Sequence, residues 1–365
     1  MAYTNIDDPS AYFQAFLYTG NQSGRQITLD GNSDLQPDLY WYKARNANHH
    51  YWVDSSRGTT KYIYSSLTSA EATVASAYVT SFNTNGFGVG GGDSGTNANG
   101  ISFGNWAWKA NGGTTASNSD GSITSTVQAN TTAGFSIVLY TGTGSAATVG
   151  HGLGVVPSVM IIKNREYAAS WVVYHKDIHA DAEEYGLRLN NTTARASTAG
   201  FWNNTAPTSS VFTIGDNSGV NNGDNTDTLV AYCFAEKQGY SKFGSYVGNG
   251  SGTSDGTFNG PMVYTGFKPS WVMVKRSDGG AEDWNIFDNK RPRGTTTGNY
   301  INNKLYANQS AAESGNIYDA VDFLSNGFKI RTGRGGTNTS GGTYIYMAFA
   351  ENPFTTSTGI PTTAR

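Results

Sequence analysis

One stretch of the sequence occurs three times, and this repetition limits the possible folds more than any other feature. The three prolines that mark it, Pro37, Pro157 and Pro269, stand 120 and 112 positions apart. The copies read QPDLYWYKAR at residues 36–45, VPSVMIIKNR at 156–165 and KPSWVMVKR at 268–276. The period matches a small domain and exceeds the repeat unit of a solenoid. We therefore expect one module that is used three times.

The segments around the copies match as well. A strand-like segment with a glycine turn precedes each proline, at residues 16–21, 138–142 and 246–250. An aromatic strand follows 13 to 15 residues after each proline, at 50–54, 171–175 and 284–288. A chance hydrophobic run would not keep both flanks in step.

The first and third copies share further signals that the middle copy lacks. Thr68 to Glu71 and Ser310 to Glu313 have the spacing of a helix capping box. Both copies also contain an Arg-Gly pair and an Asn-Gly-Phe sequence, which predicts a tight hairpin turn. These lie at residues 57–58 and 85–87 in the first copy, and at 293–294 and 326–328 in the third.

Composition and patterning favour an all-β fold. The chain has 46 glycines among 365 residues and is 13% aromatic, but only 14% charged, which is typical of strands joined by tight turns. The runs 159–162 and 271–274 are apolar on both faces, as in buried central strands. We predict three tandem antiparallel β-sandwich modules, jelly-roll or lectin-like, with short helical turns; a partly closed barrel is the alternative. The lysines and arginines after the central strands should mark their exit into solvent.

The same signals divide the chain. The expected parts are an N-terminal arm at 1–12, module 1 at 13–110, a Ser/Thr/Gly/Asn-rich linker at 111–133, module 2 at 134–239, module 3 at 240–354 and a tail at 355–365. The arm is either a floppy terminus or an anchor that orders against a neighbouring subunit. Within the linker, Ile123 and Val127 could hold the segment against a surface or form a short strand.

Charge and hydropathy exclude several classes of partner. The formal net charge is −3 and no basic run exists, which disfavours binding to nucleic acid. The longest apolar runs fall far short of a bilayer span, so no membrane insertion is expected. The polar start is not a secretory signal, and we expect the protein to stay in a cytoplasm or to leave by lysis. Cys233 is the single cysteine and should be a small buried hydrophobe.

The histidines offer weak candidates for a metal site. His175, His179 and Asp181 have the four-residue histidine spacing that binds zinc on a helix. Here the segment follows a strand and lacks the protease glutamate, so a solvated loop is the better interpretation. His50 stands where the other copies have Trp171 and Trp284, and we expect a packing position rather than a general base.

Other polar groups are also weak candidates for chemistry. The glycine-rich loops at 90–95 and 215–219 lack the P-loop lysine and the acidic spacing of an EF-hand, although a calcium site within 216–227 stays open. Exposed tyrosines could stack on sugars or on a protein partner. The candidate tyrosines are Tyr62, Tyr64, Tyr300 and Tyr306. No catalytic residue and no cofactor is predicted.

The order of motifs resembles repeat modules in virion structural proteins of marine tailed bacteriophages, often labelled tail-fibre-like. The resemblance rests on Tyr-Thr-Gly, the proline and lysine of the central stretch, the aromatic strand, Asn-Gly-Phe and the closing MAFAENPF at residues 347–354. The opening at residues 3–13 is similar too. The resemblance covers most of the chain and implies no catalytic residues. The second module departs from it after His175.

The expected function is therefore a non-enzymatic component of a phage particle, assembled in the host cytoplasm and displayed on the particle surface. It would be a tail-fibre, adsorption or head-decoration protein that binds other virion proteins and forms homo-oligomers, with host surface glycans as a further candidate ligand. The alternative is a lectin-like module or a glycan depolymerase. A depolymerase would need two carboxylates facing each other across a groove. The candidates are Asp54, Asp288, Glu282 and Asp283.

Overall fold

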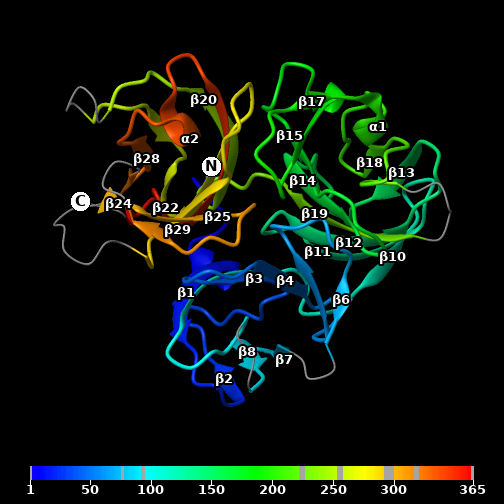
Figure 1. The fold of residues 1–365 in the computed structure, drawn as a ribbon, viewed down its shortest axis with the longest axis horizontal. Helices are drawn as coiled ribbons and strands as arrows, with labels where there is room; N and C mark the ends of the chain where they lie inside the picture. The colour runs from blue at the N-terminus through cyan, green and yellow to red at the C-terminus, as the bar shows by residue number, and fades with distance from the viewer. Residues whose placement is uncertain are drawn as a thin grey trace.

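A computed structural model of the chain describes residues 2–74, 78–91, 95–221, 227–252, 258–291, 300–315 and 320–362. It consists of three lobes around a common centre (Figure 1). The prediction of an all-β sandwich fold is confirmed, because the sheets are antiparallel throughout and the helices are single turns. The helices are η1 (Pro9–Ala11), η2 (Ala182–Glu184), α1 (Ala199–Trp202) and α2 (Gly335–Asn338). No helix among the described residues is long and apolar enough to cross a membrane.

Each lobe contains one large sheet and one smaller sheet, which together we call a module. In module 1 the large sheet has, in order, β1 (Phe13–Thr19), β9 (Ser102–Trp108), β3 (Leu39–Ala44), β4 (His50–Asp54), β5 (Lys61–Tyr64) and β6 (Ala72–Thr73). Its small sheet has β2 (Arg25–Ile27), β8 (Gly86–Val89) and β7 (Val79–Asn83).

Module 2 has the same core order with two strands added at one edge. The large sheet has, in order, β10 (Ala116–Asn118), β11 (Ser125–Asn130), β12 (Phe135–Thr141), β19 (Thr228–Phe234), β14 (Val159–Asn164), β15 (Val172–His175), β16 (Tyr185–Arg188) and β17 (Ala196–Ser197). The small sheet pairs β13 (Ala147–Gly150) with β18 (Val211–Ile214).

Module 3 repeats the order of module 1. The large sheet has, in order, β20 (Ser241–Val247), β29 (Thr343–Pro353), β22 (Phe267–Arg276), β23 (Asn285–Asp288), β25 (Asn303–Tyr306) and β26 (Ser314–Gly315). The small sheet has β21 (Met262–Tyr264), β28 (Gly327–Ile330), β27 (Val321–Leu324) and β24 (Tyr300–Ile301).

The repeated stretch forms the central strand of each large sheet, in the same register. The residue two positions after the proline always faces an aromatic residue on the last strand of its module, which is β9, β19 or β29. The pairs are Leu39 with Trp108, Val159 with Phe234, and Trp271 with Phe349. The strands β3, β14 and β22 are therefore equivalent in space as well as in sequence.

One hydrophobic core joins the three modules. The inner faces of the large sheets meet at the centre, where Trp41 of module 1 lies 6.2 Å from Trp271 of module 3, and Trp52 lies 5.1 Å from Trp171 of module 2 (ring centroids). The outer faces in modules 1 and 3 pack on the small sheets and form separate clusters. The central strands are thus covered on both sides, which explains their unbroken apolar runs.

The Asn-Gly-Phe sequences form the predicted hairpin turns. β7 and β8 are joined by two residues, as are β27 and β28, with Asn83 facing Gly86 and Leu324 facing Gly327. A Cβ atom on either glycine would stand 2.0 Å from a carbonyl oxygen of the neighbouring strand. Only glycine fits this approach of two backbones.

Two segments expected to be irregular are ordered by pairing with the rest of the chain. The linker supplies β10 and β11, which extend the large sheet of module 2. In the arm, Thr4 donates to the Gln238 carbonyl (2.7 Å) and Ile6 is buried in the shared core. Asp7 accepts from Ser357 in the tail (2.6 Å from its N–H). The described part of the arm is therefore packed against its own chain rather than floppy.

Candidate functional site: the charged seams between modules

Buried charged residues gather where the modules meet, and we call these contacts the seams. At the seam between modules 1 and 2, Glu71 precedes β6 and Arg165 follows β14. The two guanidinium nitrogens Nε and Nη2 of Arg165 donate to the Glu71 carboxylate, both at 2.9 Å. The Glu71 N–H also donates to the Arg165 carbonyl (2.8 Å). A backbone bond and a two-pronged ion pair thus join the two modules.

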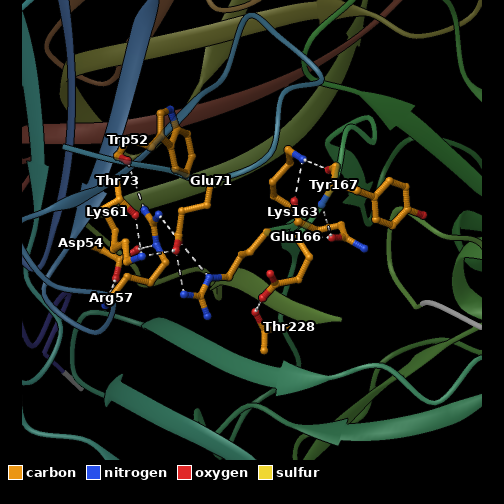
Figure 2. Close-up of polar contacts among 12 residues, drawn as sticks. Trp52, Asp54, Arg57, Lys61, Glu71, Thr73, Lys163, Glu166, Tyr167 and Thr228 are labelled. Carbon is orange, nitrogen blue, oxygen red and sulfur yellow. Dashed lines mark hydrogen bonds and ion pairs between the residues drawn. The ribbon is translucent and has the colours of Figure 1, made fainter. Parts of the chain in front are cut away.

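A second arginine completes this network from within module 1. Arg57 donates through Nη1 to Glu71 (2.9 Å) and through Nε to Asp54 (2.5 Å). Its Nη2 reaches the Trp52 carbonyl and the hydroxyl of Tyr232, which itself donates to Asp54 (2.7 Å). Figure 2 shows Arg57 between Asp54 and Glu71, below Trp52. The side chains of Arg57 and Asp54 are fully buried.

The network keeps its members charged despite burial. Burial by itself raises the pKa of Glu71, but the bonds from Arg165 and the charge of Arg57 outweigh it, so the pKa lies below its ordinary value. Burial lowers the pKa of Arg57, and the charges of Asp54 and Glu71 more than reverse this effect. Each buried charge therefore faces an opposite charge, as a stable buried ion pair requires.

The seam between modules 3 and 1 repeats this arrangement. Glu313 accepts from Arg45 of module 1 (3.0 and 2.6 Å) and from Arg291 (2.9 Å). Arg291 donates to Asp288 (2.7 Å), which also accepts from the indole of Trp106 (2.9 Å). The Glu313 N–H donates to the Arg45 carbonyl (2.7 Å). Bonds to Arg45 and the charge of Arg291 hold the pKa of Glu313 below its ordinary value, against burial.

The seam between modules 2 and 3 keeps the backbone bond, but its described residues form no counterpart of the buried ion-pair network of the other two seams. Arg195 stands where Glu71 and Glu313 stand, and its N–H donates to the Ser277 carbonyl (2.9 Å). His175 takes the place of Asp54, and Ile178 that of Arg57. The Nε2 of His175 lies 3.1 Å from the Tyr346 carbonyl, and burial lowers its pKa to about 4. This seam is therefore neutral at its centre.

The position shared by His50, Trp171 and Trp284 is a packing position, as predicted, since all three are buried. The indole of Trp171 donates to the Tyr64 carbonyl of module 1 (2.9 Å), and that of Trp284 to the Arg188 carbonyl of module 2 (3.0 Å). In His50, Nδ1 accepts from Trp41 (2.8 Å). Burial holds the pKa of His50 well below its ordinary value.

The prediction that the lysines after the central strands reach solvent is wrong. Lys43, Lys163 and Lys275 are fully buried. Each ammonium group donates to the carbonyl of the next residue and to one loop carbonyl, as Figure 2 shows for Lys163 beside Tyr167. Burial lowers the pKa to about 7 for Lys43 and to about 8 for the other two.

The capping-box interpretation also fails, because among the described residues Thr68 and Ser310 are followed by the strands β6 and β26 and not by a helix. Glu71 and Glu313 bind arginines of another module instead. The structural counterpart of Arg57 is Arg291, which stands three residues after Asp288 just as Arg57 follows Asp54. Arg293 and Gly294 lie outside the described residues.

The three metal candidates do not share a site. His175 uses both ring nitrogens, since Nδ1 accepts from the Asp177 N–H (3.1 Å) while Nε2 faces the Tyr346 carbonyl. His179 lies against Tyr185, with its Nδ1 3.7 Å from the Asp181 carboxylate. The described residues contain no group of three potential metal ligands. The calcium segment 216–227 and the loop 90–95 lie partly outside them.

The four candidate carboxylates fall into two environments. Asp54 and Asp288 are buried, and each forms an ion pair with an arginine in a different seam. Glu282 and Asp283 border a surface cavity of about 260 Å³ in module 3. The other residues around this cavity are Asn285, Lys304, Tyr306, Arg334, Gly335 and Gly336. Asp283 is held by Asn308 and Gln309, at 2.7 and 2.5 Å.

The four candidate tyrosines are all partly buried. Tyr62 and Tyr64 pack with Tyr51, at 5.6 and 4.9 Å between ring centroids. Tyr306 borders the cavity of Glu282 and Asp283, and Tyr300 lies on β24. Cys233 is buried as predicted, and burial raises its thiol pKa to about 12.

The sequence pattern does not identify the seam residues, because their partners are far apart along the chain. Glu71 and Arg165 are separated by 94 positions, and Arg45 and Glu313 by 268. One local signal was available, the Asp-x-x-Arg spacing at 54–57 and 288–291. The middle copy has His175 and Ile178 there, which marks the seam without charges.

The described part of the chain thus uses its buried charges to join modules. No curated protein and no solved structure matches the sequence significantly. A family model described as a domain of unknown function, DUF7483, matches residues 8–353. The chain belongs to this DUF7483 family.

Proposed function

We propose that the chain is a non-enzymatic structural protein of a bacteriophage virion, displayed on the particle surface, where it forms homo-oligomers and binds other virion proteins. The observation that carries the proposal is the use of buried charge. Glu71 and Glu313 each pair with two arginines at their own seam, and their carboxylates are almost fully buried. A buried side chain whose pKa is shifted, and whose charge is fully paired with other residues of the protein, favours a structural role over a catalytic one.

The shared core supports the same proposal. The three modules share one core of buried tryptophans, which leaves the loops and sheet edges for recognition. A virion protein must keep its shape outside the cell, and such a unit is suited to that task. The resemblance of the repeated motifs to phage virion proteins agrees with this role.

Locating the chain on particles tests the proposal. Antibodies against the purified chain would be applied to gradient-purified particles of the phage that encodes it, with gold detection by electron microscopy. Label at the head surface or at the tail is expected and also decides between decoration and adsorption. Particles that contain no such chain by mass spectrometry would contradict the proposal.

A second candidate function is glycan binding at the cavity of module 3. Glu282 and Asp283 offer acceptors for sugar hydroxyls, and Tyr306 offers a ring. Gly335 makes room for the Glu282 carboxylate at the edge of the cavity, since a Cβ there would stand 2.1 Å from Glu282 Oε1. Incubation with host surface polysaccharide distinguishes the outcomes. Binding lost in Asp283→Asn without new reducing ends indicates a lectin, new reducing ends indicate a depolymerase, and no binding removes this candidate.

A further inference from the structure

One edge of the large sheet is closed in module 2 and open in module 3. In module 2, β11 pairs with β12 over five residues, and β10 pairs with β11. The strand β20 corresponds to β12, because Phe135 faces Phe234 just as Ser241 faces Phe349. Within the described parts of module 3, β20 is the outermost strand of its sheet. The chain itself thus demonstrates that a strand can be added at this place.

The hydrogen bonds of β20 identify the residues that face outward. The Gly248 N–H donates to the Gly342 carbonyl, and the Ala350 N–H to the Tyr240 carbonyl. Even-numbered residues of β20 therefore bond to β29. Alternate residues of an antiparallel strand direct their backbone groups to opposite sides. The outward-facing residues are Ser241, Phe243, Ser245 and Val247.

In the first half of this edge, at Ser241 and Phe243, the outward N–H groups are hydrogen-bonded within the same chain. The Ser241 N–H donates to the Lys237 carbonyl (2.9 Å), and the Phe243 N–H donates to the Glu236 carboxylate (2.9 Å). Glu236 also pairs with Lys176 and Lys242. Charges at such positions keep a sheet edge from pairing with another chain.

The second half carries no such protection. The backbone groups of Ser245 and Val247 that face outward have no hydrogen-bond partner among the residues the structure describes. Both side chains are exposed, and Val247 is 60% exposed. No charged residue lies between Phe243 and Asn249. An uncharged, uncovered edge with an exposed valine is typical of a strand that pairs with another strand.

We propose that this open edge, residues 245–247, pairs antiparallel with the same edge of a second copy of the chain. A two-fold axis beside Tyr246 places Ser245 opposite Val247 of the second copy, and Val247 opposite its Ser245. The two outward N–H groups and two outward carbonyls of each edge then meet their counterparts in four hydrogen bonds. Every outward backbone group of this segment thus finds a counterpart on the second copy, so the edge is satisfied without any other chain.

The symmetry also limits the assembly. An isologous contact uses the edge of each copy once and therefore closes at a dimer. The two six-stranded sheets of module 3 would become one continuous sheet. The paired segment is short, so the contact falls below the usual size of a stable interface and the association should be weak and concentration-dependent. The dimer does not depend on the chain being a virion component.

Sedimentation equilibrium of the full chain tests the dimer. The weight-average mass should rise from 38.9 kDa towards twice that value as the concentration increases from about 10 µM to about 1 mM. Val247→Lys should keep the mass at that of one chain throughout. The matched control is Leu17→Lys. Leu17 lies at the corresponding edge of module 1 and is 37% exposed, and this variant should associate like the parent.

Hydrogen exchange locates the contact by residue. The Ser245 and Val247 amides should exchange quickly in dilute solution and more slowly at high concentration, whereas the Tyr246 amide, which faces β29, should be slow in both. Ser245→Pro removes an outward N–H and is a second variant in case Val247→Lys does not fold. A parent chain that stays monomeric at about 1 mM would overturn the proposal. So would association that persists in both variants without protection at residues 245 and 247.

Discussion

The seam between modules 1 and 2 and the seam between modules 2 and 3 have the same backbone contact and opposite chemistry. In the first, Glu71 donates its N–H to the Arg165 carbonyl and pairs with two arginines. In the second, Arg195 donates its N–H to the Ser277 carbonyl, and Ile178 replaces the buried arginine. The backbone and the shared core therefore set how modules meet. The charges add a requirement that each buried partner be present.

The largest effect is expected from breaking the charged seam at one point. Arg57→Ala leaves Asp54 without its buried ion-pair partner and removes one of the two arginines from Glu71. Removing one member of a buried ion pair costs about 3–5 kcal/mol. The free energy of unfolding, measured by urea denaturation at pH 7, should fall by this amount. The matched change in the neutral seam, Ile178→Val, removes one methylene and should cost about 1 kcal/mol. Equal losses would mean that the charges of the first seam matter no more than packing.

A pH titration separates the two seams. Burial lowers the pKa of His175 to about 4 from an ordinary value of 6.5, so the unfolded chain binds this proton first. Its contribution to stability is full above pH 6.5 and is lost as the pH falls to about 4, at up to about 1.4 kcal/mol per pH unit. His175→Gln should flatten this part of the stability profile.

The charged seams respond at lower pH. The folded pKa of Glu71 lies below its ordinary value of 4.5, so its contribution is present above that value and is lost as the pH falls through the folded pKa. Glu71→Gln should therefore leave the decline between pH 6.5 and 4.5 unchanged. If His175→Gln has no effect there, His175 is not the group that titrates.

Exchanging one seam for the other should cost less than breaking it. The exchange converts Asp54→His, Arg57→Ile, Glu71→Arg, Arg165→Ser and Tyr232→Met, which are the residues of the neutral seam. Because no buried charge loses its partner, the loss in unfolding free energy should stay below about 3 kcal/mol, the lower bound for Arg57→Ala. A larger loss would show that the two seams do not share one geometry.

Over the measured range of pH 7 to 9, the buried lysines give the smallest expected effect. Lys43 donates only to carbonyls, and burial lowers its pKa to about 7 from 10.5. The unfolded chain binds more protons between these values, so stability should rise with pH from about 7, by about 1 kcal/mol per unit from this group. Lys43→Met should reduce the slope between pH 7 and 9. An unchanged slope would place the Lys43 ammonium in a more polar environment than its burial indicates.

The sequence predicted what repeats locally. Apolar runs after Pro37, Pro157 and Pro269 identified the central strands, and Asn-Gly-Phe identified two hairpins, because each signal lies within a few residues. The burial of Cys233 followed from its apolar neighbours, and the packing role of His50 followed from Trp171 and Trp284 at the same place in the other copies.

The sequence did not predict what depends on distant partners. Glu71 and Glu313 have the spacing of a capping box, and only the packing of another module supplies their arginines. Lys43 follows an apolar run and resembles a strand exit, whereas loop carbonyls that the sequence does not place hold it inside. The division into parts set the linker at 111–133 apart. The short strand expected near Val127 exists as β11, but that it extends the large sheet of module 2 depends on pairing with a distant strand edge.

Calorimetry tests the central claim, that three modules share one core, most directly. The indoles of Trp41, Trp171 and Trp271 belong to one buried cluster, so no module can unfold without exposing the others. Differential scanning calorimetry of the full chain should therefore give a single transition whose calorimetric and van't Hoff enthalpies agree. Two or three separate transitions, each with the enthalpy of one module, would contradict this account.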